Sequence, residues 1–388
     1  MKRRCLSLII VICLVSVVVA GCAKNSASDT SPEYKFGTDC QYYNCTDGWY
    51  RITESEKGFY FRKEGYLYFI DKTTMQQTIL CGKPNCQHQD ETTPTNCNAY
   101  IGSHDFSLHY YDGNIYTMCI GAVRGDTPSP QIALVQISPD GSERKEIWKV
   151  DWEEDFPGYP VFATLHRGKY FLVLHTDGDT AGAVLRYDFD TKQVEMIHQF
   201  DGYLGQITAI GNTVYWQQDD SNGNWDTVAY DILSKEKRVL EDCKRVYVTE
   251  DTLLFYHFIS TMEEYKEWIV TTDLDRTNEE AYPFDIGSEI RKTKRIFPYK
   301  DNLFVFDGYD GTEIRQYDFA TGELLATLPL PEDFLAKEAE ISAALRRVAC
   351  SQNGKLMVFY EETFDAVYCD ISTIGTPDFQ WYEVEKVN

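Results

Sequence analysis

A short pattern of apolar and polar residues recurs seven times along this chain. An apolar strand is followed by an Asp, then by a turn rich in Thr, Ser or Gly, and then by a second strand. Asp, Asn and Gly tolerate the left-handed backbone of tight hairpins, and alternating apolar residues bury one face of a strand. The Asp position recurs at intervals of 42 to 67 residues, as Asp71, Ser138 (the one departure), Asp188, Asp231, Asp273, Asp318 and Asp370.

A second turn precedes each of these positions. Gly168 leads into KYFLVL, and Gly211-Asn212 leads into TVYW. Each repeat therefore holds two hairpins, and four strands in roughly 40–50 residues are the span of one propeller blade. We predict an all-β, seven-bladed β-propeller, with an eight-bladed ring or a split barrel as the alternatives. The predicted blades are 48–81, 106–149, 160–200, 203–241, 244–284, 294–330 and 346–386.

One segment between the last two blades has a helical pattern. Pro331, Glu332 and Asp333 are typical of a helix start, because Pro suits the first turn and acidic groups favour the helix N-terminus. Phe334, Ile341 and Leu345 give a partly apolar face. We predict a short inserted helix near 331–347 that packs on the propeller rim, with partner binding as the alternative role.

The first 22 residues have the layout of a bacterial export signal. Three basic residues precede an apolar run from Leu6 to Ala20, and Val19-Ala20-Gly21-Cys22 ends the run with small residues before a cysteine. Fifteen helical residues rise about 22 Å, too short for a bilayer core of roughly 30 Å. We therefore predict a signal peptide at 1–21 rather than a transmembrane helix. Cys22 is the predicted lipidation site, carrying diacylglycerol and palmitate-type chains.

The polar tract that follows, through residue 33, is too poor in apolar residues to fold and is predicted to be a flexible tether. The body is then 34–388, anchored by lipid on the extracytoplasmic face of the cell membrane. The chain carries a formal net charge of −24, which becomes −27 without the three basic residues of the signal. Such an acidic body repels phosphate backbones, so nucleic acid is excluded as a partner class.

A cysteine-rich insertion at 81–100 separates the first two blades. It carries Cys81, Cys86, His88 and Cys97 in the spacing C-x4-C-x-H-x8-C. Three thiols and one imidazole suit tetrahedral zinc, whereas an exported chain favours disulfides. A disulfide staple, a metal site and free or mixed thiols all stay open at this point. We expect the insertion on the face near the central channel, where such connecting loops lie.

The remaining cysteines and histidines are scattered. Cys40 and Cys45 repeat the x4 spacing just upstream, and could pair with each other or with the insertion. His104 and His109 flank the insertion and are further candidate ligands. We predict that the other cysteines of the body are small core residues in or beside strands: Cys119, Cys243, Cys350 and Cys369.

The lipobox-like ending and the cysteine segment support a resemblance. The segment L-C-x-x-P-x-C-x-H…C-N-A runs from Leu80 to His88 and then over Cys97, Asn98 and Ala99. It resembles a family of surface lipoproteins of Gram-positive anaerobes with propeller-like bodies, and the repeats are similar to YWTD and TolB-like propellers. The resemblance implies the fold and the location, and implies no activity.

No Ser nucleophile elbow, phosphate loop or HExxH motif occurs in the sequence. We therefore predict a non-enzymatic binding or scaffold module for protein or glycan ligands, with the channel mouth as its site. The alternatives are a cell-surface propeller enzyme acting on glycans or peptides, and a substrate-capture lipoprotein of a transporter.

Overall fold

In the computed structural model, the unit Lys35–Asn388 is built almost entirely from β-strands. Among the residues that the structure describes, no helix is long and apolar enough to cross a membrane. Cys22, Cys40, Cys45 and the predicted signal and tether lie outside the described residues. The described residues are 34–35, 39, 52–88, 97–102, 107–120, 131–151, 158–176, 181–219, 225–249, 252–260, 265–273, 280–282, 294–307, 311–341, 346–360 and 362–387.

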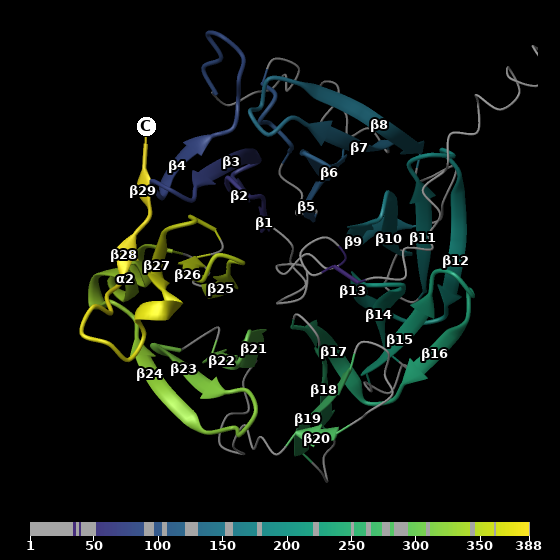
Figure 1. The fold of residues 1–388 in the computed structure, drawn as a ribbon. Coiled ribbons are helices and arrows are strands. Elements are labelled where there is room, and N and C mark those ends of the chain that lie inside the picture. The colour runs from purple at the N-terminus through teal and green to yellow at the C-terminus, as the bar shows by residue number, and fades with distance from the viewer. Residues whose placement is uncertain are drawn as a thin grey trace, which may run out of the picture. The chain divides into compact units, whose positions relative to one another are not determined.

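Seven antiparallel sheets of four consecutive strands form the unit, which confirms the predicted seven-bladed propeller. In Figure 1 the first strand of each sheet lies nearest the centre of the ring and the fourth lies on the outer rim. The predicted blade boundaries agree with the observed sheets to within a few residues. Blades 1 to 3 consist of β1 (Ile52–Glu54), β2 (Gly58–Lys63), β3 (Tyr66–Asp71) and β4 (Gln76–Ile79); β5 (Leu108–Tyr111), β6 (Asn114–Ile120), β7 (Gln131–Ile137) and β8 (Arg144–Asp151); β9 (Tyr159–His166), β10 (Lys169–His175), β11 (Gly182–Asp188) and β12 (Val194–Phe200).

The other four blades repeat this order of strands. Blades 4 to 7 consist of β13 (Leu204–Ile210), β14 (Thr213–Asp219), β15 (Trp225–Asp231) and β16 (Lys237–Leu240); β17 (Cys243–Val248), β18 (Thr252–Ser260), β19 (Tyr265–Asp273) and β20 (Glu280–Tyr282); β21 (Lys294–Tyr299), β22 (Asn302–Asp307), β23 (Glu313–Asp318) and β24 (Leu324–Pro329); β25 (Arg346–Cys350), β26 (Lys355–Tyr360), β27 (Ala366–Asp370) and β28 (Tyr382–Glu383).

The recurrent Asp shapes the turn between the third and fourth strands. Asp188 Oδ1 accepts hydrogen bonds from the backbone N–H groups of Asp190 at 3.0 Å and Thr191 at 2.9 Å. Lys192 then takes a positive φ of 59° and donates its backbone N–H to the Asp188 carbonyl. This is the chemistry of an Asx turn. Asp71, Asp231 and Asp318 likewise accept from the backbone N–H groups two and three residues further along the chain.

The core lies between successive sheets rather than within one layer. Blades 1 and 2 share one cluster of buried apolar side chains, blades 2 and 3 share another, and blades 6 and 7 a third. Aliphatic strand residues make up most of these clusters, and large Phe and Tyr rings contribute to the cluster between blades 6 and 7. Trp216 in blade 4 and Tyr170 in blade 3 are fully buried.

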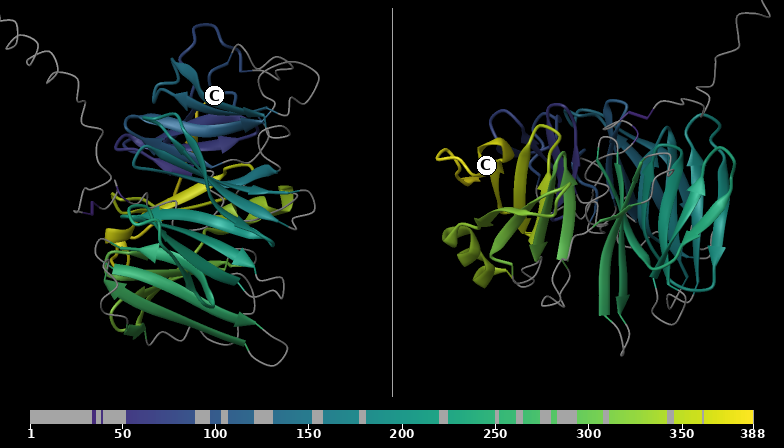
Figure 2. Two further views of the ribbon diagram at one scale, coloured as in Figure 1. Left: turned by 90° about the vertical axis from the view of Figure 1, so that its right-hand side faces the viewer. Right: turned by 60° about the horizontal axis from the view of Figure 1, so that its bottom comes forward.

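The ring closes through the C-terminus. Strand β29 (Glu385–Lys386) pairs in parallel with β4 of blade 1, as a fifth strand on that sheet. Phe61 of blade 1 stacks on Phe364 of blade 7, with ring centroids 3.5 Å apart. Figure 2 shows the yellow C-terminal end beside the purple strands of blade 1. The last predicted blade, 346–386, therefore contributes its final residues to the first sheet.

The predicted helix at 331–347 is shorter than expected. It begins after Pro331, as predicted, with Glu332 and Asp333 in its first turn, but α2 (Glu332–Ala336) has five residues and continues as the 3-10 turn η2 (Lys337–Glu340). Arg346 already belongs to β25 and is buried. Phe334 packs on Tyr360 with ring centroids 4.7 Å apart, and Lys337 pairs with Glu383 of the outermost strand β28 at 3.1 Å, so the helix packs on the rim. A further 3-10 turn, η3 (Ile371–Thr373), follows Asp370.

Candidate functional site

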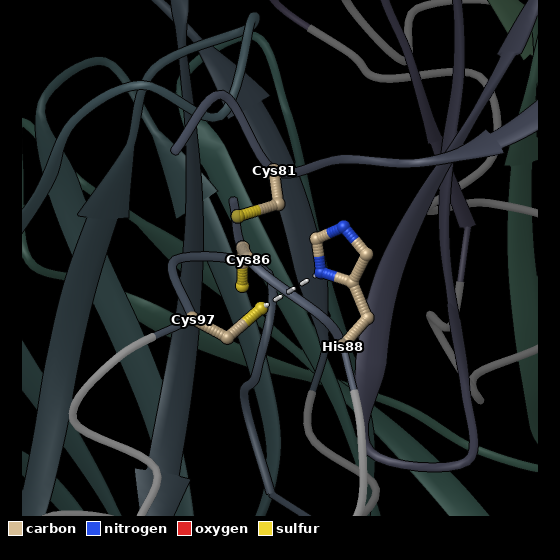
Figure 3. Close-up of side chains that lie close together, drawn as sticks. All are labelled: Cys81, Cys86, His88 and Cys97. Carbon is tan, nitrogen blue, oxygen red and sulfur yellow. Dashed lines mark hydrogen bonds between the residues drawn. The ribbon is translucent and has the colours of Figure 1, made fainter. Parts of the chain in front are cut away.

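Cys81, Cys86, His88 and Cys97 converge on one point, as Figure 3 shows. Both arms of the insertion are fixed to blade 1 through a single residue of β3. The Leu80 backbone N–H donates to the Leu67 carbonyl at 2.9 Å, and the Leu67 N–H donates to the Ala99 carbonyl at 2.7 Å. Cys81 therefore directly follows the paired Leu80, and Cys97 lies two residues before the paired Ala99, so both are held beside the same strand.

One ligand atom from each of the four side chains lies within 4.8 Å of all the others. The Cys97 Sγ and His88 Nδ1 atoms are 3.5 Å apart. Cys97 is buried, and the other three are partly exposed. None of the seven cysteines in the described part of the chain forms a disulfide.

The local backbone and the crowding of the sulfurs set the acidity of these thiols. Burial raises the pKa of the Cys97 thiol to about 12, and the neighbouring Cys81 sulfur adds to this effect. Burial alone would also raise the pKa of Cys81. However, the backbone N–H groups of Lys83 and Asn98 donate to its sulfur and hold this pKa below its ordinary value. The surroundings of the two sulfurs thus shift their pKa values in opposite directions.

The insertion also holds the third turn of blade 2. The Asn98 side-chain amide donates to the carbonyls of Gly141 at 2.9 Å and Ser142 at 2.8 Å. The Gly82 backbone N–H donates to the same Gly141 carbonyl at 3.1 Å. Arg144, at the start of β8, donates to the Tyr100 carbonyl. The four converging side chains therefore lie where blade 1 meets blade 2.

Contrary to the expectation of a position near the central channel, the cluster lies on the outer rim. It follows the outermost strand β4 and contacts the turn between β7 and β8, the two outer strands of blade 2. Figure 1 shows the segment after β4 reaching outward from the ring. The physical reason is sheet twist, which turns the outer strands of a blade away from the direction of its inner strand.

A groove of about 840 Å³ lies beside the cluster, between blades 1 and 2. The buried side chains of Tyr60 and Leu80 and the half-buried side chain of Phe69 provide its apolar surface. Four carboxylates and one Lys provide the charge. The groove is lined by Glu56, Lys57, Tyr60, Phe69, Asp71, Thr73, Leu80, Ser138, Pro139, Asp140, Ser142 and Glu143.

Sequence reasoning missed this groove. Its two walls are at least 58 positions apart in the sequence, from Leu80 to Ser138, and neither carries a recognisable motif. The one available signal was the replacement of the recurrent Asp by Ser138, which marks the irregular turn that forms one wall.

Within the described part of the chain, the other histidines and cysteines singled out from the sequence do not join the four converging side chains. His109 lies in β5, fully buried and edge-on to the Tyr170 ring at 5.7 Å, and it is not among the four converging side chains. His104 lies outside the described residues. The prediction of core cysteines is confirmed for Cys119, Cys243, Cys350 and Cys369, which are all buried in strands.

Comparison with known proteins shows the fold and leaves the family open. No protein-family model matches the chain, and no curated protein matches its sequence. A solved prolyl endopeptidase matches with a TM-score of 0.54 at 11% identity, over 88% of this chain. The chain covers only 51% of that enzyme, so it spans about half the length of the structure it matches.

Two other solved structures resemble the chain more loosely. A hydrazine synthase chain from Kuenenia stuttgartiensis matches at 12% identity and a TM-score of 0.48, covering 90% of this chain and 99% of that one. BamB from Moraxella catarrhalis matches at 9% identity and a TM-score of 0.44, covering 84% of this chain and 95% of that one. At these identities the likeness concerns architecture alone.

Proposed function

We propose that this chain is a lipid-anchored, extracytoplasmic binding module whose propeller captures a protein partner in the groove between blades 1 and 2. The groove is the observation that carries the proposal. Its volume of about 840 Å³ falls within the range of roughly 300–1,000 Å³ that is usual for ligand pockets. Seven packed blades and the closing strand β29 give it a rigid frame.

The chemistry of the groove favours a cationic, extended segment of a protein. Glu56, Asp71, Asp140 and Glu143 outnumber the single Lys57. The half-buried ring of Phe69 offers a face for an Arg or Lys side chain to pack on. The net charge of −24 extends the same preference over long range and speeds the encounter with a basic partner.

Selection of peptides against the immobilised chain tests this proposal. We expect enrichment of Lys- and Arg-containing peptides whose binding weakens with salt. The double variant Glu56→Gln/Glu143→Gln changes two exposed groove carboxylates and should weaken binding about tenfold, which corresponds to about 1.4 kcal/mol.

The matched control is Glu236→Gln/Glu323→Gln, which changes the net charge equally at exposed positions on blades 4 and 6. Equal weakening by both double variants would contradict a site in the groove. Enrichment of neutral or acidic peptides would contradict the choice of partner. Cleavage of the selected peptides would favour the enzyme alternative instead.

The membrane anchor is a separate part of the proposal, and the export signal with its Cys22 supports it. Two acyl chains give stable membrane attachment, whereas one gives marginal attachment. In cells, the chain should sediment with membranes and gain the mass of two acyl chains and a glyceryl group. The variant Cys22→Ser should not gain this mass, and the same gain of mass in that variant would contradict lipidation at Cys22.

A further inference from the structure

The spacing of the four converging side chains matches the first coordination shell of a tetrahedral metal ion. Zinc bonds of about 2.3 Å to sulfur and about 2.0–2.1 Å to nitrogen place neighbouring ligand atoms about 3.8 Å apart for two sulfurs and about 3.5 Å apart for sulfur and nitrogen. The Cys97 Sγ and His88 Nδ1 atoms are 3.5 Å apart. All four ligand atoms lie within 4.8 Å of one another, so the shell closes with shifts below about an ångström.

The donor set selects the class of metal. Three sulfurs and one imidazole nitrogen are the borderline-soft ligands that zinc takes, whereas calcium and magnesium prefer oxygen ligands, which these four side chains do not supply. Four protein ligands fill a tetrahedron and leave no open position for water. Such a closed shell is typical of structural zinc sites rather than catalytic ones.

The backbone around the sulfurs supports this coordination. N–H groups of Lys83 and Asn98 donate to the Cys81 sulfur, and the N–H of Ala99 donates to the Cys97 sulfur. Hydrogen bonds of this kind orient metal ligands and stabilise thiolate charge. His88 takes a left-handed φ of 51°, which an L-residue adopts at a cost, and this conformation accompanies a ring directed at the sulfurs.

A disulfide accounts for less of this arrangement. A bond between two of the sulfurs would leave the third thiol and the His88 ring with no role in the cluster. It would also leave the left-handed backbone at His88 unexplained. Metal coordination uses all four side chains together.

We propose that Cys81, Cys86, His88 and Cys97 bind one zinc ion, which clamps the insertion of blade 1 onto blade 2. The ion joins residues 81–88, which leave blade 1 and carry three ligands, to residues 97–102, which return to it and carry Cys97. Asn98 follows Cys97 directly, and its amide holds the carbonyls of Gly141 and Ser142. The metal therefore fixes the turn that forms one wall of the groove. Zinc binding by these residues does not rest on the binding function proposed above, and metal content tests it separately.

Metal analysis of the purified full chain, prepared in detergent without reductant or chelator, tests the proposal. We expect one zinc per chain, with Cys81, Cys86 and Cys97 resistant to alkylation until the metal is removed. Cobalt substituted for zinc should show the visible absorption of a tetrahedral site with thiolate ligands.

Two ligand variants and one control complete the test. Cys97→Ser should lose at least nine-tenths of the zinc. His88→Ala, a change at a partly exposed side chain, should lower zinc affinity at least tenfold and keeps the test available if Cys97→Ser fails to fold. Cys243→Ser is the matched control, since Cys243 lies in blade 5 and is not among the four converging side chains. It should keep one zinc per chain.

Two results would overturn the proposal. The first is metal-free protein that has lost the mass of two hydrogens through a bond between any two of Cys81, Cys86 and Cys97. The second is a full zinc content in both Cys97→Ser and His88→Ala.

Discussion

The third turn of blade 2 and the third turn of blade 3 have the same place in the repeat and different chemistry. In blade 3, Asp188 binds the N–H groups of its own turn, and the turn residues are exposed. In blade 2, Ser138 replaces the Asp, and Asp140 binds the turn instead, at 2.6 Å from the Ser138 hydroxyl. Gly141 is buried against the insertion. A departure from the repeat thus marks the place where one blade is adapted to hold another.

The largest expected effect comes from adding a methyl group at Gly141. Its φ is +68°, and a Cβ would lie 2.5 Å from the Leu80 carbonyl oxygen. The left-handed backbone costs an L-residue about 1–2 kcal/mol, and the overlap with backbone atoms should raise the loss for Gly141→Ala to roughly 3 kcal/mol. Urea unfolding measures this loss.

Gly113→Ala is the control for backbone strain alone. Its φ is +74°, but no atom lies within 4 Å of the added Cβ. We expect a loss of about 1–2 kcal/mol there. Equal losses at the two glycines would contradict the close docking of the blade 2 turn.

Asn98→Ala should have the next largest effect. It removes two hydrogen bonds and leaves the Gly141 and Ser142 carbonyls without those donors, at a cost of about 2 kcal/mol in the free energy of unfolding. Asn114→Ala is the matched change in a plain hairpin, where the amide makes one exposed bond of 3.1 Å to the Asp112 carbonyl. Its expected cost is below about 1 kcal/mol. A larger loss at Asn114 would contradict the clamp between blades.

The regular turns should each contribute a smaller amount. Asp188→Ala removes two hydrogen bonds to backbone N–H groups, and we expect a loss of about 1 kcal/mol, comparable to the removal of a helix cap. Asp231→Ala should cost about the same, since its turn makes the same two bonds. Thermal unfolding of both variants checks whether the repeat is energetically uniform.

The smallest effect is a dependence on pH. Hydrogen bonds from Ser138 and Ser142 lower the pKa of Asp140 to about 2, and backbone N–H groups lower the pKa of Asp71 and Asp318. Because these folded-state pKa values are depressed, the contributions are fully present above the unfolded value of about 3.9 and are lost as pH falls through the folded values.

Unfolding of Asp140→Asn should therefore depend less on pH between about 4 and 2 than unfolding of the parent chain. Both proteins should carry the Cys97→Ser change, so that release of metal at low pH does not contribute. Identical pH profiles would contradict the role of Asp140 in the turn.

The repeated features of this molecule could be predicted from the sequence because each appears several times. Asp188 and its counterparts sit in turns whose chemistry is local, so the pattern shows both the turn and its register. The grouping of Cys81, Cys86, His88 and Cys97 was predictable for a different reason, which is their short spacing in the sequence.

Features that depend on distant segments were not predictable. The pairing of Glu385 with Gln76 joins the two ends of the body through a two-residue strand with no pattern of its own. The rim position of Cys97 depends on the twist of whole sheets, and its contact with blade 2 depends on Asn98 meeting Gly141, 43 positions away. The helix after Pro331 is short: Ile341 already has an extended backbone, and Arg346 begins a buried strand.

Hydrogen exchange of the two compared turns, with and without metal, tests the central claim most directly. Removal of zinc by a chelator should speed exchange in residues 80–82, 97–102 and 138–143, and should leave residues 188–193 of blade 3 unchanged. That result would show that the metal clamps blade 1 onto blade 2. Unchanged exchange in the 138–143 turn after complete removal of zinc would contradict the account.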